Sequence, residues 1–309
     1  MAKNIGKGDA IFTTNFSFFA TTEVISTIGA TPVFIDVDIK TFNLNPDNLE
    51  YQITETINKG KLIPKAIIAV DLFGQLCDYK KIKEIAKKYN LLLIEDAAQS
   101  FGASYKNKKS CSFGDISATS FFPAKPLGCY GDGGAIFTND KQLAELCRSI
   151  RVHGMGKDKY DNVRIGMNSR LDTLQAAILL NKLNIFDNEI YLRNKNAKIY
   201  SNNLKENLIV PYIEDKNISS WAQYSLLANS EKDRDSLIEY LNQYNIPTAI
   251  YYKKPFNTLD LYKHLNYHND EYKISHMLSK RIFSIPMHPY LEDVDLNKII
   301  DKISQFFKS

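Results

Sequence analysis

Short uninterrupted runs of apolar residues recur through the first half of the chain. They occupy residues 31–36, 65–70 and 91–94, and two further runs follow at residues 118–122 and 134–138. Runs of this length are typical of strands that are buried on both faces of a parallel sheet. The pattern therefore predicts a mostly parallel sheet in the first half of the protein.

Between these runs, apolar residues recur three and four positions apart, as on one face of a helix. This spacing predicts helices over residues 20–28, 79–89 and 141–150. The second of them carries the densest run of lysines, which we interpret as the solvated face of an amphipathic helix. Strands that alternate with helices predict a doubly wound α/β domain.

The pattern changes in the second half of the chain. Helical spacing with few breakers runs from residue 171 to about residue 204 and predicts one long helix or two stacked ones. Beyond it, the pattern predicts two strands and two helices, at residues 222–228, 248–252, 234–244 and 294–307. We therefore expect a large α/β domain at residues 1–194 and a smaller α+β domain at residues 195–309.

Composition narrows the class of protein. Of the 309 residues, 44% are hydrophobic and 24% are charged, as in a soluble globular protein of two packed units. The net charge of +4 without a clustered basic face argues against nucleic-acid binding. No apolar run is long enough to span a bilayer, and residues 1–9 lack the apolar core of a signal peptide. We expect a cytoplasmic protein without membrane contact.

The cysteines and histidines do not form a metal-binding pattern. The four cysteines are widely spaced and include no C-x-x-C pair, which favours a reducing compartment over a disulfide framework or a zinc site. His264 and His268 lie four positions apart, but the Asn and Asp residues around them favour a solvated loop. No metal is therefore expected.

Two polar clusters fall at the carboxyl ends of predicted strands. The first, EDAAQS from Glu95 to Ser100, comes directly after the run at residues 91–94. The second begins at Ser120 and reaches Lys125 within a stretch of Phe, Pro, Ala and Gly. Ligands of open α/β sheets bind beyond the carboxyl ends of the strands. Packing alone hardly explains two carboxylates beside a buried run, or a lysine in such surroundings.

A lysine combined with a carboxylate at such a site points to Schiff-base chemistry. An amine is nucleophilic only when deprotonated, which requires a partly desolvated lysine. A pyridine cofactor is an electron sink only while its ring nitrogen stays protonated, and a carboxylate beside it holds that proton. Ser120 supplies a hydroxyl for a cofactor phosphate, five residues before Lys125. Neighbours on a strand face opposite ways, so these arguments leave Glu95 and Asp96 as alternatives.

Several motifs stand in a fixed order along the chain. They are IEDAAQSFGA at residues 94–103, SFFPAKPLGCYGDGGA at 120–135, VHG at 152–154 and GMNSRLD at 166–172, followed by WAQY, IPTAIYY and IPMHP. Together they resemble the DegT-type sugar-nucleotide aminotransferase family over nearly the whole chain. The resemblance implies the fold type I architecture: a large domain with a mostly parallel sheet flanked by helices, plus a smaller α+β carboxyl-terminal domain.

The resemblance also implies pyridoxal 5′-phosphate as the cofactor and assigns roles to the two polar clusters. Lys125 forms the Schiff base and carries the proton, Asp96 pairs with the pyridine nitrogen, and Ser120 binds the phosphate. Gln99 contacts the ring on its hydroxyl side. A structural role as a turn residue is the alternative for Gln99.

Two further residues enter only through the resemblance. Phe18 stacks on the ring face, and its alternative is packing in the core. Asn168 reaches the cofactor phosphate of the neighbouring subunit in a homodimer with shared active sites. A helix cap before the helix predicted from residue 171 is the alternative for Asn168.

The activity implied is transfer of an amino group from a donor such as glutamate to a nucleotide-linked keto sugar, for surface polysaccharide or glycan biosynthesis. The segments at residues 221–224 and 246–252 look most like those of members that act on UDP-linked N-acetylated hexoses. Amination at carbon 3 or at carbon 4 stays open. Lys125 argues against a dehydratase variant, which has histidine there. The lack of a strand–G-x-G-x-x-G–helix unit argues against a nicotinamide enzyme.

The chain departs from the family pattern at its start. Members have a few dozen residues before the point that matches Met1, including a Ser-Gly-Thr turn around the cofactor phosphate and the first sheet strand. We expect a chain without them to bind the cofactor weakly and to have little activity. The alternative function is therefore a non-catalytic remnant or partner subunit that keeps the fold.

Overall fold

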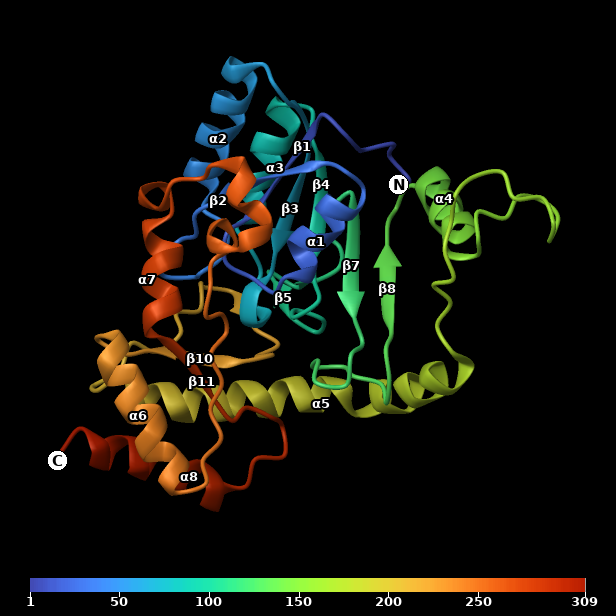
Figure 1. Cartoon of the computed structure of the whole chain (residues 1–309). Coiled ribbons are helices and arrows are strands. Elements are labelled where there is room, and N and C mark those ends of the chain that lie inside the picture. Colours follow the sequence, from blue (N-terminus) through green and yellow to red (C-terminus); the bar gives the residue numbers. More distant parts are fainter. Residues whose placement is uncertain (309) are drawn as a thin grey trace.

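A computed structural model describes residues 1–308 and has a six-stranded sheet at its centre, with the strand order β2-β1-β3-β4-β7-β8 (Figure 1). The strands are β1 (Asp9–Thr14), β2 (Thr31–Ile35), β3 (Ile63–Val70), β4 (Leu92–Asp96), β7 (Ile116–Ser120) and β8 (Gly134–Phe137). All neighbours from β2 to β7 pair in parallel, and β8 pairs antiparallel with β7. The prediction of a mostly parallel sheet is confirmed.

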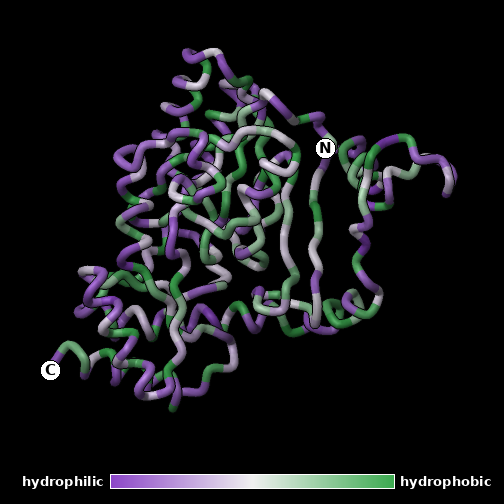
Figure 2. Tube along the Cα trace, in the orientation of Figure 1, coloured by the Kyte–Doolittle hydropathy of each residue, from purple (hydrophilic) through white to green (hydrophobic). Residues whose placement is uncertain are grey.

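Helices cover both faces of the sheet. Those of the described residues are α1 (Ala20–Thr27), α2 (Pro46–Lys59), α3 (Tyr79–Lys88), α4 (Lys141–Arg151), α5 (Thr173–Leu204), α6 (Glu231–Gln243), α7 (Lys273–Arg281) and α8 (Asp293–Phe306). α2 and α3 pack on the face that receives Phe12 and Ile67, whereas Ile25 of α1 packs on the face that receives Ile11 and Ile68. Neighbouring residues of one strand thus enter opposite cores, which accounts for the unbroken apolar runs. Figure 2 shows hydrophobic positions concentrated along these strands.

Local signals set the ends of α2, a helix that the sequence patterns did not predict. The Asn45 side chain caps its start by accepting from two backbone N–H groups, and Pro46 occupies the first turn. Gly60 ends it in the left-handed conformation, with φ of 62°. The buried residues of α2 include Leu49 and Ile53, which face the sheet. Asn45-Pro46 and Gly60 were therefore the sequence signals from which the start and the end of α2 could have been predicted.

The predicted helical stretch after residue 171 is one helix, α5, of 32 residues. It runs beneath the sheet and into the carboxyl-terminal part of the chain (Figure 1). Its first half packs Phe186 against Phe121 of the sheet region, and its second half packs Tyr200 and Leu204 into a separate core. The domain boundary near Asn194 stays a prediction, since α5 continues through that point.

The carboxyl-terminal part is built on two antiparallel strands, β10 (Tyr224–Leu227) and β11 (Ile282–Ile285), with α6 and α8. The strand predicted at residues 248–252 is wrong. Only Ala249 pairs there, in a single bridge to Ser284, because Pro247 offers no N–H and a turn begins at Tyr251. The remaining short elements are β5 (Ser104–Tyr105), β6 (Lys108–Lys109), β9 (Asn217–Ile218), η1 (Leu72–Gly74), η2 (Phe256–Thr258), η3 (Asp260–Leu265) and η4 (Asn269–Glu271).

Strand β8 ends the sheet, with β7 as its only paired strand among residues 1–308. Its Ile136 side chain is exposed. A hollow of about 950 Å³ lies between this strand and α4, lined by Ile136, Phe137 and Cys147 among others. Figure 1 shows α4 standing apart from β8, with the following segment reaching away from the body. This side of the sheet is therefore the more open one.

Candidate active site

Most of the predicted site residues gather at one edge of the sheet. The carboxyl ends of β1, β3, β4 and β7 share this edge because the strands are parallel. Asp96 ends β4 and Ser120 ends β7. Phe18 lies in the loop after β1, and Lys125 lies in the turn after β7. These residues therefore lie at the carboxyl ends of the strands, where open α/β sheets bind ligands.

The Asp96 carboxylate faces this edge and is held at both oxygens. Thr21 Oγ1 donates to Asp96 Oδ2 over 2.8 Å, and the Ala98 backbone N–H donates to Oδ1 over 3.2 Å. Burial raises the pKa of Asp96, while these two hydrogen bonds and the charge of Lys125 act to lower it. Asp96 and Lys125 therefore interact electrostatically across the site.

Glu95 lies on the opposite side of the strand and is fully buried. Its two carboxylate oxygens accept hydrogen bonds from the backbone N–H groups of Cys111, Phe113 and Gly114 and from Ser117 Oγ, over 2.6–3.2 Å. This carboxylate fastens the segment before β7 to β4. The structure thus separates the two carboxylates that sequence reasoning left as alternatives, with Asp96 on the side of Lys125.

Lys125 has the surroundings that an amine nucleophile needs. Its backbone N–H closes a turn by donating to the Phe122 carbonyl over 2.9 Å. The side chain is half-buried, and within residues 1–308 its Nζ makes no hydrogen bond or ion pair. Burial lowers the pKa of Lys125, and Asp96 only partly opposes this effect. A larger fraction of this amine is therefore uncharged than in an exposed lysine.

Ser120 and Gln99 flank these two groups. Ser120 Oγ accepts from the Phe122 backbone N–H over 3.2 Å, which leaves its own hydrogen available to a ligand. Gln99 is buried in a turn, and its side chain also makes hydrogen bonds. Its Oε1 accepts from the Phe73 N–H over 2.7 Å, and its Nε2 donates to the Tyr252 hydroxyl over 3.1 Å. One amide hydrogen of Gln99 remains free for a ligand.

Gly74 permits the close packing behind Gln99. Its φ is 100°, and a Cβ there would overlap Ser220 Oγ and lie 2.8 Å from the Trp221 nitrogen. Ser220 Oγ in turn donates to the Gln99 carbonyl over 2.6 Å. A side chain at position 74 would therefore push the segment at residues 219–222 away from the turn that carries Gln99.

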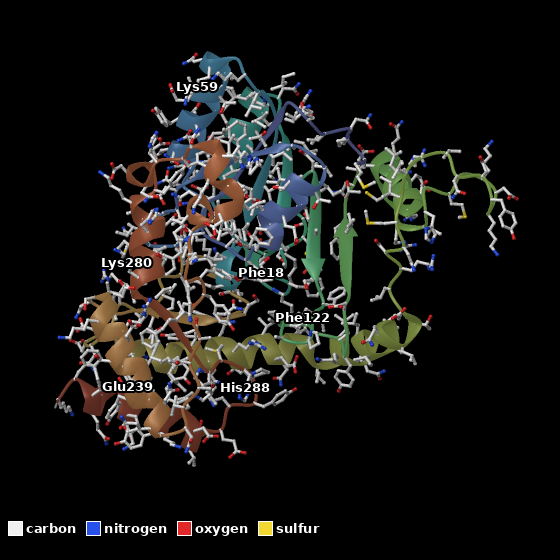
Figure 3. All side chains as sticks on the ribbon, viewed as in Figure 1. Phe18, Lys59, Phe122, Glu239, Lys280 and His288 are labelled. Atoms are coloured by element: carbon white, nitrogen blue, oxygen red, sulfur yellow. The ribbon has the colours of Figure 1, made fainter. Side chains whose placement is uncertain are left out.

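Phe18 presents its ring to solvent. It is 57% exposed, whereas Phe16, two residues earlier, is fully buried. Its ring centroid lies 6.4 Å from that of Tyr252, and Figure 3 shows it between the end of the sheet and α5. The alternative that Phe18 belongs to the core is wrong. An exposed aromatic at this edge can cover a flat ligand.

Asn168 does not join this cluster in its own chain. It is exposed and pairs with Val152 at the end of α4, and within residues 1–308 its side chain makes no hydrogen bond to the other predicted residues. The alternative of a helix cap is wrong, because the cap residue of α5 is Asp172. Its exposure leaves it available to a neighbouring subunit.

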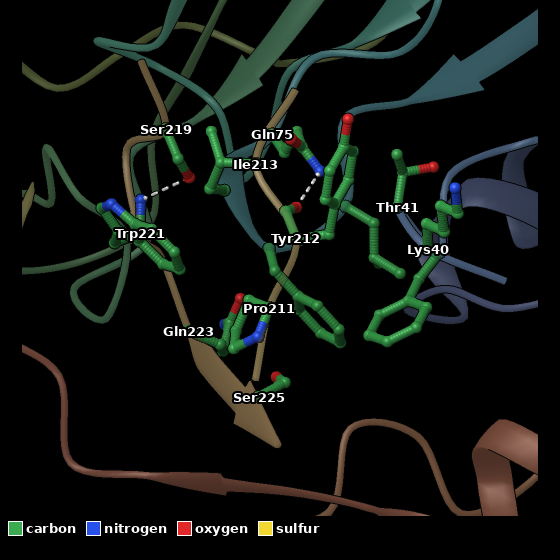
Figure 4. A pocket seen from close by; sticks show the side chains of 13 residues that line it. Lys40, Thr41, Gln75, Pro211, Tyr212, Ile213, Ser219, Trp221, Gln223 and Ser225 are labelled. Atoms are coloured by element: carbon green, nitrogen blue, oxygen red, sulfur yellow. Dashed lines mark hydrogen bonds between the residues drawn. The ribbon is translucent and has the colours of Figure 1, made fainter. Parts of the chain in front are cut away.

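A small cavity of about 20 Å³ is distinct from the cluster (Figure 4). It has room for about one water molecule, and Phe73, Trp221 and Gln223 are among its lining residues. None of the six predicted site residues lines it. Among residues 1–308, no group of three or more His, Cys, Asp and Glu side chains is placed to hold a metal ion, and no helix is long and apolar enough to cross a bilayer.

The residues at the sheet edge fit pyridoxal phosphate. An amine with a lowered pKa suits the aldehyde, and a half-buried carboxylate suits the ring nitrogen, at Lys125 and Asp96 respectively. The exposed ring of Phe18 suits the face of the pyridine, and the Ser120 hydroxyl suits the phosphate. Each chemical demand of the cofactor therefore meets a residue of matching chemistry.

Sequence reasoning missed two residues of this site. Thr21 bonds to Asp96, and Tyr252 bonds to Gln99 and packs near Phe18. Thr21 gave a weak signal, as a hydroxyl at the start of a helix that follows a predicted site loop. Tyr252 lay within a quoted motif, but its contact with Gln99 joins positions 153 residues apart.

Comparisons with known proteins identify the family. The sequence profile of the DegT/DnrJ/EryC1/StrS aminotransferase family matches residues 1–304. The chain is 46% identical to the UDP-2-acetamido-2-deoxy-3-oxo-D-glucuronate aminotransferase of Pseudomonas aeruginosa, over 97% of this chain and 80% of that protein. It superposes on a DegT DnrJ EryC1 StrS aminotransferase from Brucella abortus with a TM-score of 0.97 and 48% identity, covering 100% of this chain and 82% of the other. For S. venezuelae DesV, solved with a ketimine intermediate, the TM-score is 0.92 with 29% identity, over 100% and 81%. The chain therefore belongs to the DegT/DnrJ/EryC1/StrS aminotransferase family of pyridoxal-phosphate-dependent sugar aminotransferases.

Proposed function

We propose that this enzyme transfers an amino group from glutamate to the keto group of a UDP-linked N-acetylated hexose, in the cytoplasm, for surface polysaccharide or glycan biosynthesis. The observation that carries the proposal is the pairing of an amine of lowered pKa, Lys125, with a carboxylate at the same sheet edge, Asp96. The name of the Pseudomonas relative, a 3-oxo-glucuronate aminotransferase, supports a UDP-linked acceptor and amination at carbon 3.

The roles follow from the chemistry of each side chain. Pyridoxal phosphate supplies an electron sink when bound to Lys125. Asp96 holds the proton on the ring nitrogen, Ser120 binds the phosphate and Phe18 covers the ring. Once the amine of glutamate has replaced it on the cofactor, the freed Lys125 Nζ takes the proton from the amine-bearing carbon of glutamate and later delivers one to the former keto carbon of the sugar. Glutamate leaves as 2-oxoglutarate and the sugar leaves with the amine, so the amino group is conserved.

We further propose a homodimer in which Asn168 of each subunit serves the neighbouring site. The support is the position of Asn168, exposed and apart from its own cluster, on a segment that extends away from the body (Figure 1). The same segment exposes Tyr160 and Ile165, at 84% and 82%. Apolar side chains so exposed favour coverage by a partner surface.

Isotope transfer tests the activity directly. The purified chain with a large excess of pyridoxal phosphate, ¹⁵N-glutamate and a UDP-linked 3-keto N-acetylated hexose should give a detectable amount of ¹⁵N-labelled amino sugar by mass spectrometry. The matched 4-keto sugar should react more slowly, and Lys125→Ala should transfer no label. Bound cofactor without transfer to either sugar would contradict the proposed acceptor. A chain that folds without binding the cofactor would favour the non-catalytic alternative.

Mixed subunits test the shared site. Neither Lys125→Ala nor Asn168→Ala alone should be fully active, but a mixture refolded together should regain activity, since some sites then receive both native residues. A mass measurement by light scattering should give twice the chain mass. Equal activity of the mixture and of the separate variants, or a monomer of full activity, would contradict the proposed dimer.

A further inference from the structure

We infer that Thr21 is a positioning residue for Asp96: its hydroxyl holds the carboxylate ionised and oriented for the cofactor ring nitrogen. The inference rests on the role proposed above for Asp96. It extends the site to a side chain on α1, an element that also packs on the sheet through Ile25.

The geometry fixes the orientation of the carboxylate. Each oxygen of Asp96 has one donor, Thr21 Oγ1 at 2.8 Å on Oδ2 and the Ala98 N–H at 3.2 Å on Oδ1. Two donors on different oxygens restrict rotation of the group about its Cβ–Cγ bond. The shorter bond comes from the side chain, so Thr21 is the stronger of the two constraints.

The Thr21 hydroxyl is itself fixed. Thr21 is 6% exposed, and its Oγ1 lies 3.4 Å from Ser17 Oγ. Because the Thr21 hydrogen goes to Asp96, Ser17 is the donor in the second contact. A β-branched side chain in a helix also has few χ1 rotamers. The hydroxyl therefore reaches Asp96 from a rigid position, and the hydrogen-bonded chain from Ser17 polarises it further.

Electrostatics give the hydrogen bond a function. Burial works against the charged form of Asp96, and only a charged carboxylate favours a proton on the ring nitrogen. Lys125 is the charged group that favours ionisation of Asp96, but the pKa of Lys125 is itself lowered by burial. Tyr252 also faces Asp96 and stays neutral, because burial raises its pKa. The Thr21 hydroxyl and the Ala98 N–H are thus the supports that do not depend on another titration, and the hydroxyl is the closer of the two.

The neighbouring threonine offers a matched control. Thr22 is also buried in the first turn of α1, but its Oγ1 donates to the Tyr262 hydroxyl over 3.0 Å. Thr21→Val and Thr22→Val remove the same atom from adjacent positions and keep the β-branched shape. Thr21→Ser keeps the hydroxyl at the first position. Only loss of the Thr21 hydroxyl should alter the pKa of Asp96.

The first measurement uses the chain without cofactor. Carboxyl ¹³C NMR of aspartate-labelled protein, with Asp96 assigned by its absence in Asp96→Asn, reports the pKa of Asp96. Thr21→Val should raise it by about one unit, the effect of losing one hydrogen bond to the charged form. Thr21→Ser and Thr22→Val should leave it at the parent value. A Thr21→Val pKa equal to that of the parent overturns the inference.

The second measurement uses bound cofactor labelled with ¹⁵N in the ring. Thr21→Val should shift the ring nitrogen toward its unprotonated signal and weaken cofactor binding about tenfold, and Thr21→Ser should restore both. If Asp96→Asn leaves the ring-nitrogen signal unchanged, the role of Asp96 is wrong and the inference falls with it. If Asp96→Asn changes the signal but Thr21→Val does not, only the inference about Thr21 is overturned. Should Thr21→Val fail to fold, Thr21→Ala carries the same expectation.

Discussion

Glu95 and Asp96 are sequence neighbours whose carboxylates serve opposite sides of one strand. Glu95 is fully buried and satisfied by three backbone N–H groups and one hydroxyl. Asp96 is half-buried, accepts one hydroxyl and one N–H, and faces Lys125. The pleat of the strand thus assigns a structural role to the first carboxylate and a ligand-facing role to the second.

Amide substitutions should separate these two roles. Glu95→Gln places an NH₂ group against backbone donors and should lower the free energy of unfolding by on the order of 3 kcal/mol. Asp96→Asn should change stability far less but slow transamination by orders of magnitude, because the ring nitrogen loses its charged partner. Urea unfolding of the cofactor-free chains and single-turnover kinetics check the pair. Equal kinetics in Asp96→Asn and the parent would assign the ring contact to another group.

The sequence predicted the large α/β domain because buried parallel strands leave a local signal, but it missed β1, an interior strand of the sheet. Thr13 and Thr14 break the apolar run there, although both are buried in the structure. Thr13 Oγ1 donates to the Ile68 carbonyl over 3.0 Å, which offsets the cost of burying a hydroxyl. A hydrogen bond between strands that are neighbours in the sheet but far apart in the sequence has no signature in local periodicity.

The residues of the candidate site likewise divide into those with a local sequence signal and those without one. Asp96, Ser120 and Lys125 lie at or just beyond the carboxyl ends of predicted strands, so the rule about strand ends located them. The partners Thr21 and Tyr252 come from a helix start and from the carboxyl-terminal part of the chain. Their contacts arise only once the sheet and α5 have brought these segments together, which spacing along the chain does not encode.

The amine of Lys125 should titrate below that of an exposed lysine. Burial lowers the pKa of Lys125, whereas a hydrogen bond from Lys88 to Glu50 raises that of Lys88. Acetylation of the cofactor-free chain over a pH series can be quantified by peptide mass spectrometry. The pH at which the acetylation rate is half-maximal should be lower for Lys125 than for Lys88. Using the midpoint and not the rate removes the effect of differing access. Coincident midpoints would contradict the assigned environment.

Phe18 and Phe16 form a second matched pair. Phe16→Ala empties a fully buried position and should cost about 3–5 kcal/mol of stability. Phe18→Ala removes a ring that is 57% exposed, so stability should change by less than about 1 kcal/mol. Cofactor affinity should instead fall about tenfold, since the ring face loses its aromatic cover. Thermal unfolding and cofactor titration by absorbance measure the two effects. Unchanged affinity in Phe18→Ala would exclude ring stacking.

Asp71, which follows β3 behind the site, should make stability depend on pH. It is fully buried and accepts from the Cys77 N–H, the Tyr79 hydroxyl and the Ser100 hydroxyl. Burial, followed by the negative charge of Glu95, raises the pKa of Asp71 well above its usual value of 3.8. The folded chain therefore holds a proton at Asp71 that the unfolded chain releases as pH rises.

The sign follows from this difference. The stabilising contribution of the Asp71 proton is complete below the unfolded pKa and is lost as pH rises toward the folded pKa. Asp71→Asn keeps the shape and has no such proton, and its NH₂ can donate to Ser100 Oγ. Its stability relative to the parent should therefore grow with pH above about pH 4, by up to about 1.4 kcal/mol per pH unit. Urea unfolding across this range measures the difference.

Glu50→Gln is a control of opposite sign, because the exposed pair with Lys88 lowers the pKa of Glu50. Parallel curves for Asp71→Asn and the parent would show that Asp71 is ionised in the folded protein.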